Sequence, residues 1–245
     1  MRIIRTLLHW LYIFWVFLVF SVFMIILLPG ILLPFFFGQR FGIISYTFLK
    51  LWSWIFSKLN FIPYRLIGRE HLEKGKAYIY VSNHTSFLDI PGLTMAISGQ
   101  FRPLAKKELL KIPVFGWIAQ RASIIVDRSS AKSRQESIGR LKKILEMGIS
   151  ILIFVEGTQN RTKEILQPFK DGAFRIAVDT QQPLLPIVVV GAGRLMPPGT
   201  INMRPGLIKV VAGPEISVEG LTTEDIPALK AATFESMKKM ILENS

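Results

Sequence analysis

The chain reads Ala77-Tyr78-Ile79-Tyr80-Val81-Ser82-Asn83-His84-Thr85-Ser86-Phe87-Leu88-Asp89 where an apolar run leads directly into a polar turn. The run 77–81 is rich in aromatic and β-branched residues, which is typical of a buried strand. The turn holds His84, one of three histidines, and Asp89 follows five residues on. An imidazole beside a carboxylate is a common general base, because the carboxylate fixes the tautomer and stabilises the imidazolium. We expect His84 after a strand and Asp89 in the first turn of the next helix.

From residue 61 onward, short apolar runs alternate with stretches of helical periodicity. Strands are expected at 63–67, 77–81, 123–127, 149–155, 184–190 and 207–212. Helices are expected at 89–98, 113–120, 131–147, 171–181 and 224–243. Strands interleaved with helices predict an α/β fold, a mixed sheet flanked by helices. We therefore expect an α/β domain over residues 61–245.

Residues 1–60 differ from the rest, since no Lys, Arg, Asp or Glu occurs between Arg5 and Arg40. As a helix the run 7–28 measures about 33 Å, enough to cross a hydrocarbon core of about 30 Å. Pro29 and Gly30 are expected to end it. A cleaved signal peptide is the alternative, but the run is too long for one and lacks a clear small-residue cleavage site.

A second helix is expected at 41–58. A narrow polar stripe repeats along it at helical spacing, and the remaining surface is apolar. The stripe consists of Tyr46, Lys50, Ser53 and Ser57. This pattern is typical of a helix that lies in a membrane interface with its tryptophans at headgroup depth. A buried core helix is the alternative, because an apolar run of this length fits both.

Basic residues flank the first apolar run on both sides. They are Arg2, Arg5, Arg40, Lys50 and Lys58. The positive-inside rule places both flanks in the cytoplasm, which a hairpin entering and leaving one leaflet satisfies and a single span does not. We therefore expect residues 1–60 to form a membrane-embedded helical hairpin on the cytoplasmic face of the cell membrane.

The composition narrows the class of partner. The net charge of +13 predicts a polyanion: nucleic acid, an anionic membrane surface or a phosphorylated substrate. A mean hydropathy of +0.39 favours membrane lipids over nucleic acid. The absence of cysteine excludes thiolate catalysis and disulfides, and three scattered histidines argue against a zinc site, so neither a metal nor a cofactor is expected.

Two further predicted strands run into polar turns. Arg128 follows the strand at 123–127 and suits bidentate phosphate binding, or else a surface pair with Asp127. Glu156-Gly157-Thr158 follows the strand at 149–155, and Gly157 lets a substrate approach the backbone, where its N–H would bind an oxyanion. An ordinary turn is the alternative at this second place.

Together these stretches resemble the motifs of the glycerolipid acyltransferase family, most closely its 1-acyl-sn-glycerol-3-phosphate acyltransferases of the PlsC type. The family's Asn-His-x4-Asp element is matched by Asn83, His84 and Asp89. Its Gly-x-Ile-Phe-Val-Asp-Arg and Phe-Pro-Glu-Gly-Thr-Arg-Ser elements resemble 122–128 and 154–160, and its proline in a Val/Ile-rich strand resembles 185–188. The elements keep the family's order across about residues 76–190. The departures are Ala122, Ile125, Val155, Gln159 and Asn160.

The resemblance implies an enzyme that moves a fatty acyl group from a thioester donor to a lysophospholipid hydroxyl, most closely 1-acyl-sn-glycerol-3-phosphate, giving phosphatidic acid. His84 would remove the hydroxyl proton, Asp89 would orient His84, and Glu156 would position the acceptor or its cations. Backbone N–H near Gly157 and the Lys106 ammonium would meet the oxyanion. The acceptor would be bound by Arg128, Thr158, Arg161 and Lys170.

The acceptor and the donor stay open. Gln159 stands where the family usually has an arginine thought to hold the acceptor phosphate, so glycerol-3-phosphate, another lysophospholipid and a lyso-ornithine lipid are alternatives. A membrane adaptor that binds anionic lipid without catalysis is a different class. The donor is acyl-CoA or acyl carrier protein. An expected basic patch for an acidic carrier comprises Arg102, Lys106, Lys107 and Lys111.

Overall fold

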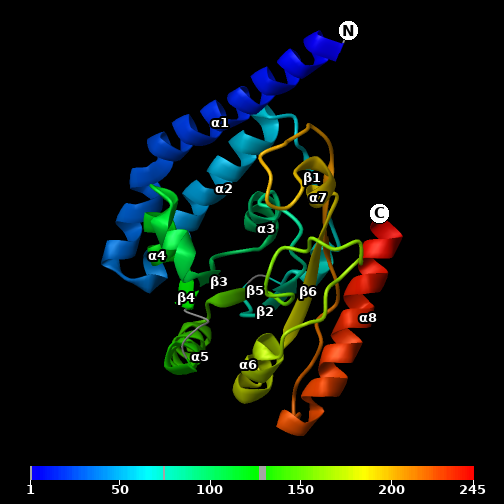
Figure 1. Ribbon diagram of the computed structural model, residues 1–245. Helices are drawn as coiled ribbons and strands as arrows, with labels where there is room; N and C mark the ends of the chain where they lie inside the picture. Colours follow the sequence, from blue (N-terminus) through cyan, green and yellow to red (C-terminus); the bar gives the residue numbers. More distant parts are fainter. Residues whose placement is uncertain (1, 74, 127–130) are drawn as a thin grey trace.

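A seven-stranded sheet forms the centre of the protein in a computed structural model that describes residues 2–73, 75–126 and 131–245 (Figure 1). The strands are β1 (Tyr64–Ile67), β2 (Ile79–Ser82), β3 (Phe101–Lys106), β4 (Ile124–Val126), β5 (Ser150–Phe154), β6 (Leu184–Val190) and β7 (Ile208–Ala212). Their order across the sheet is β1-β7-β6-β2-β5-β3-β4. The sheet is mixed, as expected, because β6 and β7 pair antiparallel while the other neighbours pair parallel.

Helices cover both faces of this sheet. One face carries α1 (Arg2–Leu32), α2 (Gly42–Leu59), α3 (Asp89–Ala96) and α4 (Phe115–Ala122), and the other carries α5 (Ala131–Glu146), α6 (Gly172–Thr180) and α8 (Ile226–Asn244) (Figure 1). A short helix, α7 (Ala192–Leu195), follows β6. The expected α/β fold, a mixed sheet flanked by helices, is confirmed.

The central strand β2 shows why both faces are covered. Tyr78 and Tyr80 belong to the core under α1 to α4, whereas Ile79 and Val81 belong to the core under α5, α6 and α8. Successive side chains of a strand point to opposite faces, so an apolar run without polar alternation must be buried on both sides. All four side chains are at most 1% exposed.

One strand was not expected from the sequence. β3 has the sequence Phe-Arg-Pro-Leu-Ala-Lys, and its arginine, proline and lysine hide the strand pattern. Pro103 lacks an N–H for the ladder, yet it pairs in register with Leu152 of β5. The remaining strands fall within a few residues of the expected ranges.

The first helix is longer than expected. α1 continues through Pro29 and Gly30 to Leu32 and passes into a 3-10 turn, Leu33–Phe37. The expected break at Pro29 was wrong: Pro29 removes one hydrogen bond of the helix, but the turn after it stays helical and packed, with Ile31 fully buried. Gly30 has a packing role, since a Cβ there would lie 2.6 Å from the Phe48 ring of α2.

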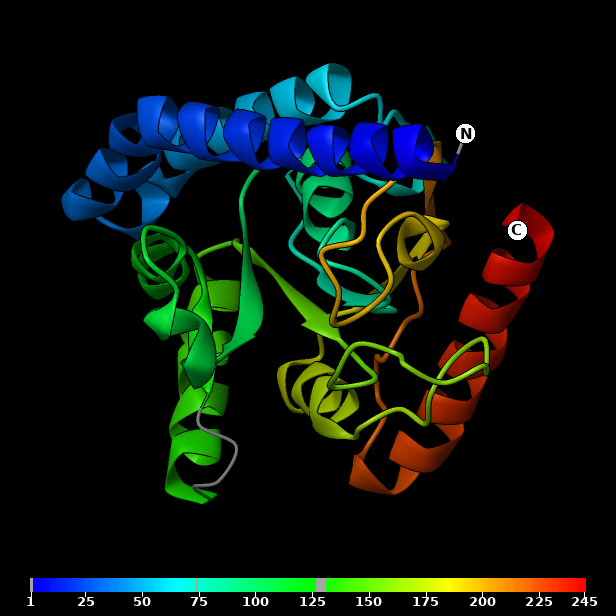
Figure 2. The same cartoon turned by 45° about the horizontal axis from the view of Figure 1, so that its top comes forward.

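α1 and α2 form an antiparallel pair that packs on the sheet. Phe20 meets Trp52 edge-on with ring centroids 5.1 Å apart, and the Tyr12 hydroxyl donates to the Asn60 carbonyl at 2.8 Å. The start of α1 is also held, because His9 and Asn202 are hydrogen-bonded at 2.7 Å. Figure 2 shows α1 lying across one side of the molecule with α2 beside it.

The polar stripe of α2 faces the protein and not a polar medium. Tyr46, Ser53 and Ser57 are buried, and their hydroxyls donate to backbone carbonyls. The outer surface of the pair is apolar instead, as at Phe14, which is 67% exposed, and Trp54, which is 54% exposed. Among the described residues, Arg2–Phe37 is the stretch long and apolar enough, by length and composition, to cross a membrane.

Candidate active site

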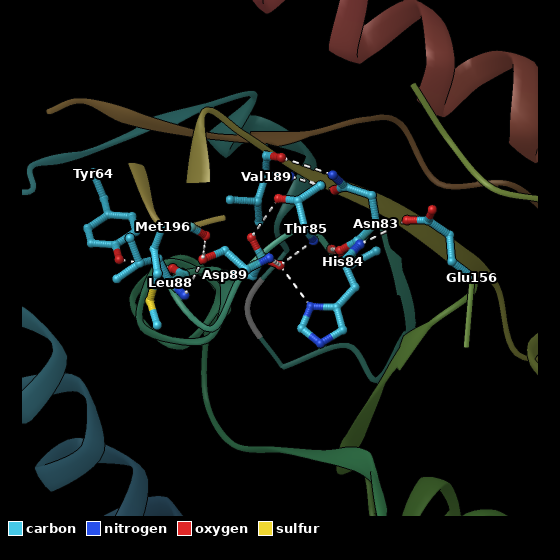
Figure 3. Close-up of polar contacts among 11 residues, drawn as sticks. Tyr64, Asn83, His84, Thr85, Leu88, Asp89, Glu156, Val189 and Met196 are labelled. Atoms are coloured by element: carbon cyan, nitrogen blue, oxygen red, sulfur yellow. Dashed lines mark hydrogen bonds and ion pairs between the residues drawn. The ribbon is translucent and has the colours of Figure 1, made fainter. Parts of the chain in front are cut away.

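The turn after β2 is fixed to the neighbouring strand by one side chain. Asn83 is 2% exposed, donates from Nδ2 to the Val189 carbonyl at 2.9 Å, and accepts the Val189 N–H at 2.8 Å (Figure 3). The side-chain amide thus pairs with the backbone of β6 in the way that another strand would. This pair of hydrogen bonds sets where the next residue, His84, leaves the sheet.

Asp89 holds the His84 ring. Its carboxylate is fully buried at the start of α3, and Oδ2 accepts Nδ1–H of His84 at 2.8 Å. The same oxygen accepts the backbone N–H groups of Thr85 and Ser86 at 2.8 and 2.9 Å. Because a carboxylate only accepts, it places the ring proton on Nδ1 and leaves the Nε2 lone pair free. Figure 3 shows the other ring nitrogen pointing away from Asp89.

The backbone of His84 is fixed as firmly as its ring. Glu156 Oε1 accepts the His84 N–H at 3.0 Å, and Oε2 accepts the Gln167 N–H at 2.8 Å. Asn160 donates its own N–H to the His84 carbonyl at 2.7 Å. The loop after β5 therefore grips His84, in that it forms hydrogen bonds with both the N–H and the carbonyl of this residue. Phe154 stacks on the His84 ring with ring centroids 4.0 Å apart.

Glu156 has a different place from the one expected. We expected it to position the acceptor or the cations, but both oxygens are engaged by backbone N–H groups and the side chain is 2% exposed. Burial raises the pKa of its carboxyl, and the N–H donors of Gln167 and His84 offset part of that rise. Glu156 is therefore a positioning residue for the His84 turn.

The exposed edge of His84 opens into a cavity of about 970 Å³. Six of the predicted site residues line this cavity. They are His84, Lys106, Gly157, Thr158, Arg161 and Lys170. Asp89 and Glu156 lie behind His84 and do not reach it. Arg128 lies outside the described residues. The structure thus brings together side chains that the sequence holds far apart.

The cavity lining contains basic residues, apolar residues and one acidic residue, Glu108. Lys106, Arg161 and Lys170 have no carboxylate within ion-pair distance in the part of the chain that the structure describes. The apolar lining comes from β3, β5 and the helices over them. It includes Leu104, Phe115, Ile138, Leu141, Ile153 and Ile176. A ligand with an anionic end and a long hydrocarbon part suits this combination of lining residues.

Two expectations about donors are corrected. The Gly157 N–H donates to the Phe154 carbonyl at 2.9 Å and closes a turn, with Gly157 at φ 79°, so it is already engaged and does not face an oxyanion. Arg102 is 1% exposed and bonds to Gln39 and Gln100, so it is not part of a surface patch with Lys106, Lys107 and Lys111. Arg102 instead ties the α1–α2 connection to β3.

Two glutamines that line the cavity were not among the predicted site residues. Gln159 stood out from the sequence only as a departure from a motif, and Gln167 did not stand out at all. Both lie in the loop that grips His84. Their position in that loop, after a buried strand that ends in an acidic turn, is the sequence signal that points to them.

A family model described as Acyltransferase matches residues 64–190 of this chain. An acyltransferase of Schizosaccharomyces pombe is 31% identical over 204 residues, 81% of this chain and 72% of the relative. Human 1-acyl-sn-glycerol-3-phosphate acyltransferase alpha is 32% identical over 73% of this chain, and a chloroplastic enzyme of that name from Brassica napus is 35% identical over 62% of it. The match spans 63% of the human protein and 44% of the Brassica one.

A solved structure resembles the whole chain. The crystal structure of a 1-acyl-sn-glycerophosphate acyltransferase from Thermotoga maritima superposes with a TM-score of 0.83 at 23% identity. The likeness covers 99% of this chain and 97% of that one. The fold is therefore shared over almost the whole of both chains.

Proposed function

The chain belongs to the acyltransferase family, and we propose that it transfers a fatty acyl group from a thioester donor to the free hydroxyl of 1-acyl-sn-glycerol-3-phosphate, giving phosphatidic acid. The names of the human and Brassica relatives support this acceptor. The observation that carries the proposal is His84, held through Nδ1 by buried Asp89 and open on its other side to a cavity with basic and apolar walls.

In the proposed step, Nε2 of His84 takes the proton of the acceptor hydroxyl while the hydroxyl oxygen bonds to the thioester carbon. The carbon–sulfur bond then breaks, and the proton passes from His84 to the departing thiol. Asp89 stabilises the imidazolium between these events and keeps its orientation. No metal, cofactor or covalent enzyme intermediate takes part, because the acyl group moves directly from donor to acceptor.

The cations of the cavity have separate places in this proposal. Arg161 and Lys170 lie in the loop between β5 and α6. They bind the acceptor phosphate together with Thr158. Lys106 reaches the cavity from the end of β3 and stabilises the oxyanion, a part that the Gly157 N–H does not take. The apolar residues of the lining contact a substrate acyl chain.

We also propose that α1 and α2 attach the protein to the cytoplasmic face of the cell membrane as a hairpin in one leaflet. The pairing of the helices along their length and the bond from His9 to Asn202 keep α1 flat against the domain. The exposed surface of the pair is apolar, which suits burial in lipid. A lipid acceptor then reaches His84 without drawing its chain into water.

Mass spectrometry of the products tests the proposal. The purified protein is given a mixture of lysophospholipids and glycerol-3-phosphate, with acyl-CoA or with acyl carrier protein as donor. Phosphatidic acid as the main product supports the proposed acceptor, and the donor that turns over identifies the partner. A main product formed from another acceptor means that this other molecule is the acceptor in place of 1-acyl-sn-glycerol-3-phosphate. Lipid binding without any acyl transfer means that the protein is a non-catalytic membrane adaptor.

A further inference from the structure

The connecting loop, residues 196–207 between α7 and β7, is attached to the turn that carries the base. The Met196 carbonyl accepts the hydroxyl of Ser86 at 2.8 Å. Ser86 follows His84 by two residues, is 1% exposed, and donates its own N–H to Asp89 at 2.9 Å. The beginning of the connecting loop is therefore fixed relative to His84 by a buried hydrogen bond.

The same loop is attached to α1 further along. Asn202 Oδ1 accepts Nε2–H of His9 at 2.7 Å, although the two residues are 193 positions apart in the chain. In Figure 2 the connecting loop, drawn in gold, lies beside the N-terminal half of α1. The N–H and the hydroxyl of Thr200 both donate to the Pro197 carbonyl, at 3.2 and 3.0 Å, which closes a turn inside the loop. Hydrogen bonds and a proline thus give the loop a defined shape between its two attachments.

Between these attachments the loop packs on an arginine of the cavity. Gly199 has a φ of 76°, and a Cβ at this position would lie 2.9 Å from Nη2 and 3.2 Å from Cζ of Arg161. The backbone can lie this close to the guanidinium only because glycine has no Cβ. An arginine side chain has many rotamers when nothing packs against it, so the contact with Gly199 restricts where the Arg161 guanidinium lies.

The connecting loop therefore joins two groups of the cavity that come from different strands. His84 follows β2 and Arg161 follows β5, and both line the cavity. The loop reaches the His84 turn through Met196 and reaches Arg161 through Gly199. One ligand that contacts both groups needs them at a fixed separation, and groups held in place before binding lose less conformational freedom when the ligand arrives.

We infer, on the basis of the proposed function, that the connecting loop holds Arg161 at a set distance from His84, with Gly199 and Asn202 as positioning residues. Gly199 supports the Arg161 guanidinium, and Asn202 fixes the loop to α1 through His9. The affinity for the acceptor then depends on a segment outside every motif that the sequence showed, and on the place of α1 against the domain.

Gly199→Ala tests the support of Arg161. The matched control is Gly220→Ala, because Gly220 has a φ of 74° and a Cβ there would meet nothing within 4 Å. Both variants carry the cost of a left-handed backbone, and only the first has the contact. Isothermal titration calorimetry measures the binding of short-chain lysophosphatidic acid to the full-length protein in lipid nanodiscs. Acyl transfer gives the acceptor KM and kcat, and thermal unfolding gives the Tm.

We expect Gly199→Ala to weaken acceptor binding and raise the acceptor KM by roughly tenfold relative to Gly220→Ala, with kcat and Tm alike in the two variants. In an Arg161→Ala background, Gly199→Ala should have no further effect on binding, because no guanidinium remains to be displaced. If Gly199→Ala does not fold, Gly199→Asn and Gly220→Asn replace the pair, since asparagine tolerates a left-handed backbone and has the same Cβ.

A double-mutant cycle tests the attachment to α1. His9→Leu and Asn202→Leu each remove one partner, and Asn202→Asp keeps an acceptor oxygen for His9. We expect each leucine variant to weaken acceptor binding by about threefold to fivefold, the double variant to be no weaker than either single one, and Asn202→Asp to bind like wild type. Vesicle flotation should not change. Thr6→Val is the control, because the Thr6 hydroxyl donates only within α1, to the Arg2 carbonyl.

Different results overturn each part. Acceptor binding by Gly199→Ala that equals that of Gly220→Ala, or an equal loss in the absence of Arg161, overturns the role of Gly199. Additive losses in the leucine double variant, or binding like wild type in both single ones, overturn the role of Asn202.

The inference and the proposed function also fail separately. A wild-type protein that shows the expected pattern of acceptor binding across these variants but transfers no acyl group refutes the proposed function and keeps the positioning role of the loop. A wild-type protein that acylates 1-acyl-sn-glycerol-3-phosphate while the loop variants bind and react like their controls refutes the inference alone.

Discussion

The Glu156 carboxylate accepts the backbone N–H of His84 at 3.0 Å and does not contact the His84 ring. Glu156 and Asp89 therefore divide the control of one histidine, since the first fixes its backbone and the second fixes its ring. Because Oε2 of Glu156 also accepts the Gln167 N–H, one buried side chain joins the turn after β2 to the loop after β5. The position of His84 thus depends on a group that is 2% exposed and does not line the cavity.

Replacing Glu156 by glutamine tests this division. An amide offers one acceptor oxygen and an NH2 donor, so one of the two backbone N–H groups faces another donor. We expect a lower Tm and a kcat reduced by roughly tenfold, because the His84 turn loosens. Steady-state kinetics and thermal unfolding are the measurements. Glu164→Gln, at an exposed position of the same loop, is the control and should behave like wild type.

Glu156 also predicts a pH dependence of stability. Burial raises the pKa of its carboxyl above the usual 4.5, so the folded protein holds this proton more tightly than the unfolded chain does. The stability that this group contributes is therefore present below about pH 4.5 and is lost as pH rises through the higher folded value. We expect the Tm of wild type minus that of Glu156→Gln to fall as pH rises from about 4 to 7. A difference that stays flat or grows contradicts the raised pKa.

His84→Ala removes the proposed base. We expect kcat to fall by about 10²–10⁴, because general-base catalysis contributes that much, while the fold persists. The assay is acyl transfer in liposomes, with thermal unfolding run beside it. His71→Ala, at a histidine that does not line the cavity, keeps its activity if the effect is specific. Turnover like wild type in a folded His84→Ala protein ends this mechanism.

Asp89→Asn keeps the shape of the carboxylate but not its charge. Its amide NH2 donates to Nδ1, which moves the ring proton to Nε2, the atom that must accept the hydroxyl proton. We expect kcat to drop by about 10²–10⁴ with little change in the acceptor KM. Asp179→Asn, at an exposed position near the end of α6 that does not line the cavity, serves as the comparison. A large rise in KM with kcat preserved means that Asp89 acts on binding instead.

The exposed surface of the helix pair predicts membrane attachment. Phe14→Glu places a charge on the outer side of α1, where the native ring is 67% exposed. We expect binding to vesicles with anionic lipid to weaken by at least about tenfold, since a buried carboxylate is costly in lipid. Vesicle flotation measures it. Leu242→Glu, on α8 across the sheet, adds the same charge at a position 56% exposed and should leave binding unchanged.

The sequence by itself predicted the architecture and pointed to His84 as the candidate base. The apolar run of β2 required cover on both faces, and the interleaved strands and helices required a flanked sheet. The expected placement of His84 in the turn after a strand and of Asp89 in the first turn of the next helix is confirmed, and it sets the ring against the carboxylate. β3 was not predicted, because its proline and cations hide the strand pattern. α1 continues through Pro29 because the turn that follows packs on the protein, with Ile31 fully buried.

Only the tertiary structure decided which polar groups are free to act. Glu156 and His84 are 72 residues apart in the chain, yet the buried Glu156 carboxylate accepts backbone N–H groups of His84 and Gln167. The Gly157 N–H donates to the Phe154 carbonyl within a turn, and Arg102 is buried below the surface. The two glutamines kept unpaired donors in the cavity wall. A local sequence pattern reports periodicity and residue type. The hydrogen-bond partner of a buried polar group comes from a distant segment, so only the folded chain determines which polar groups can bind a substrate.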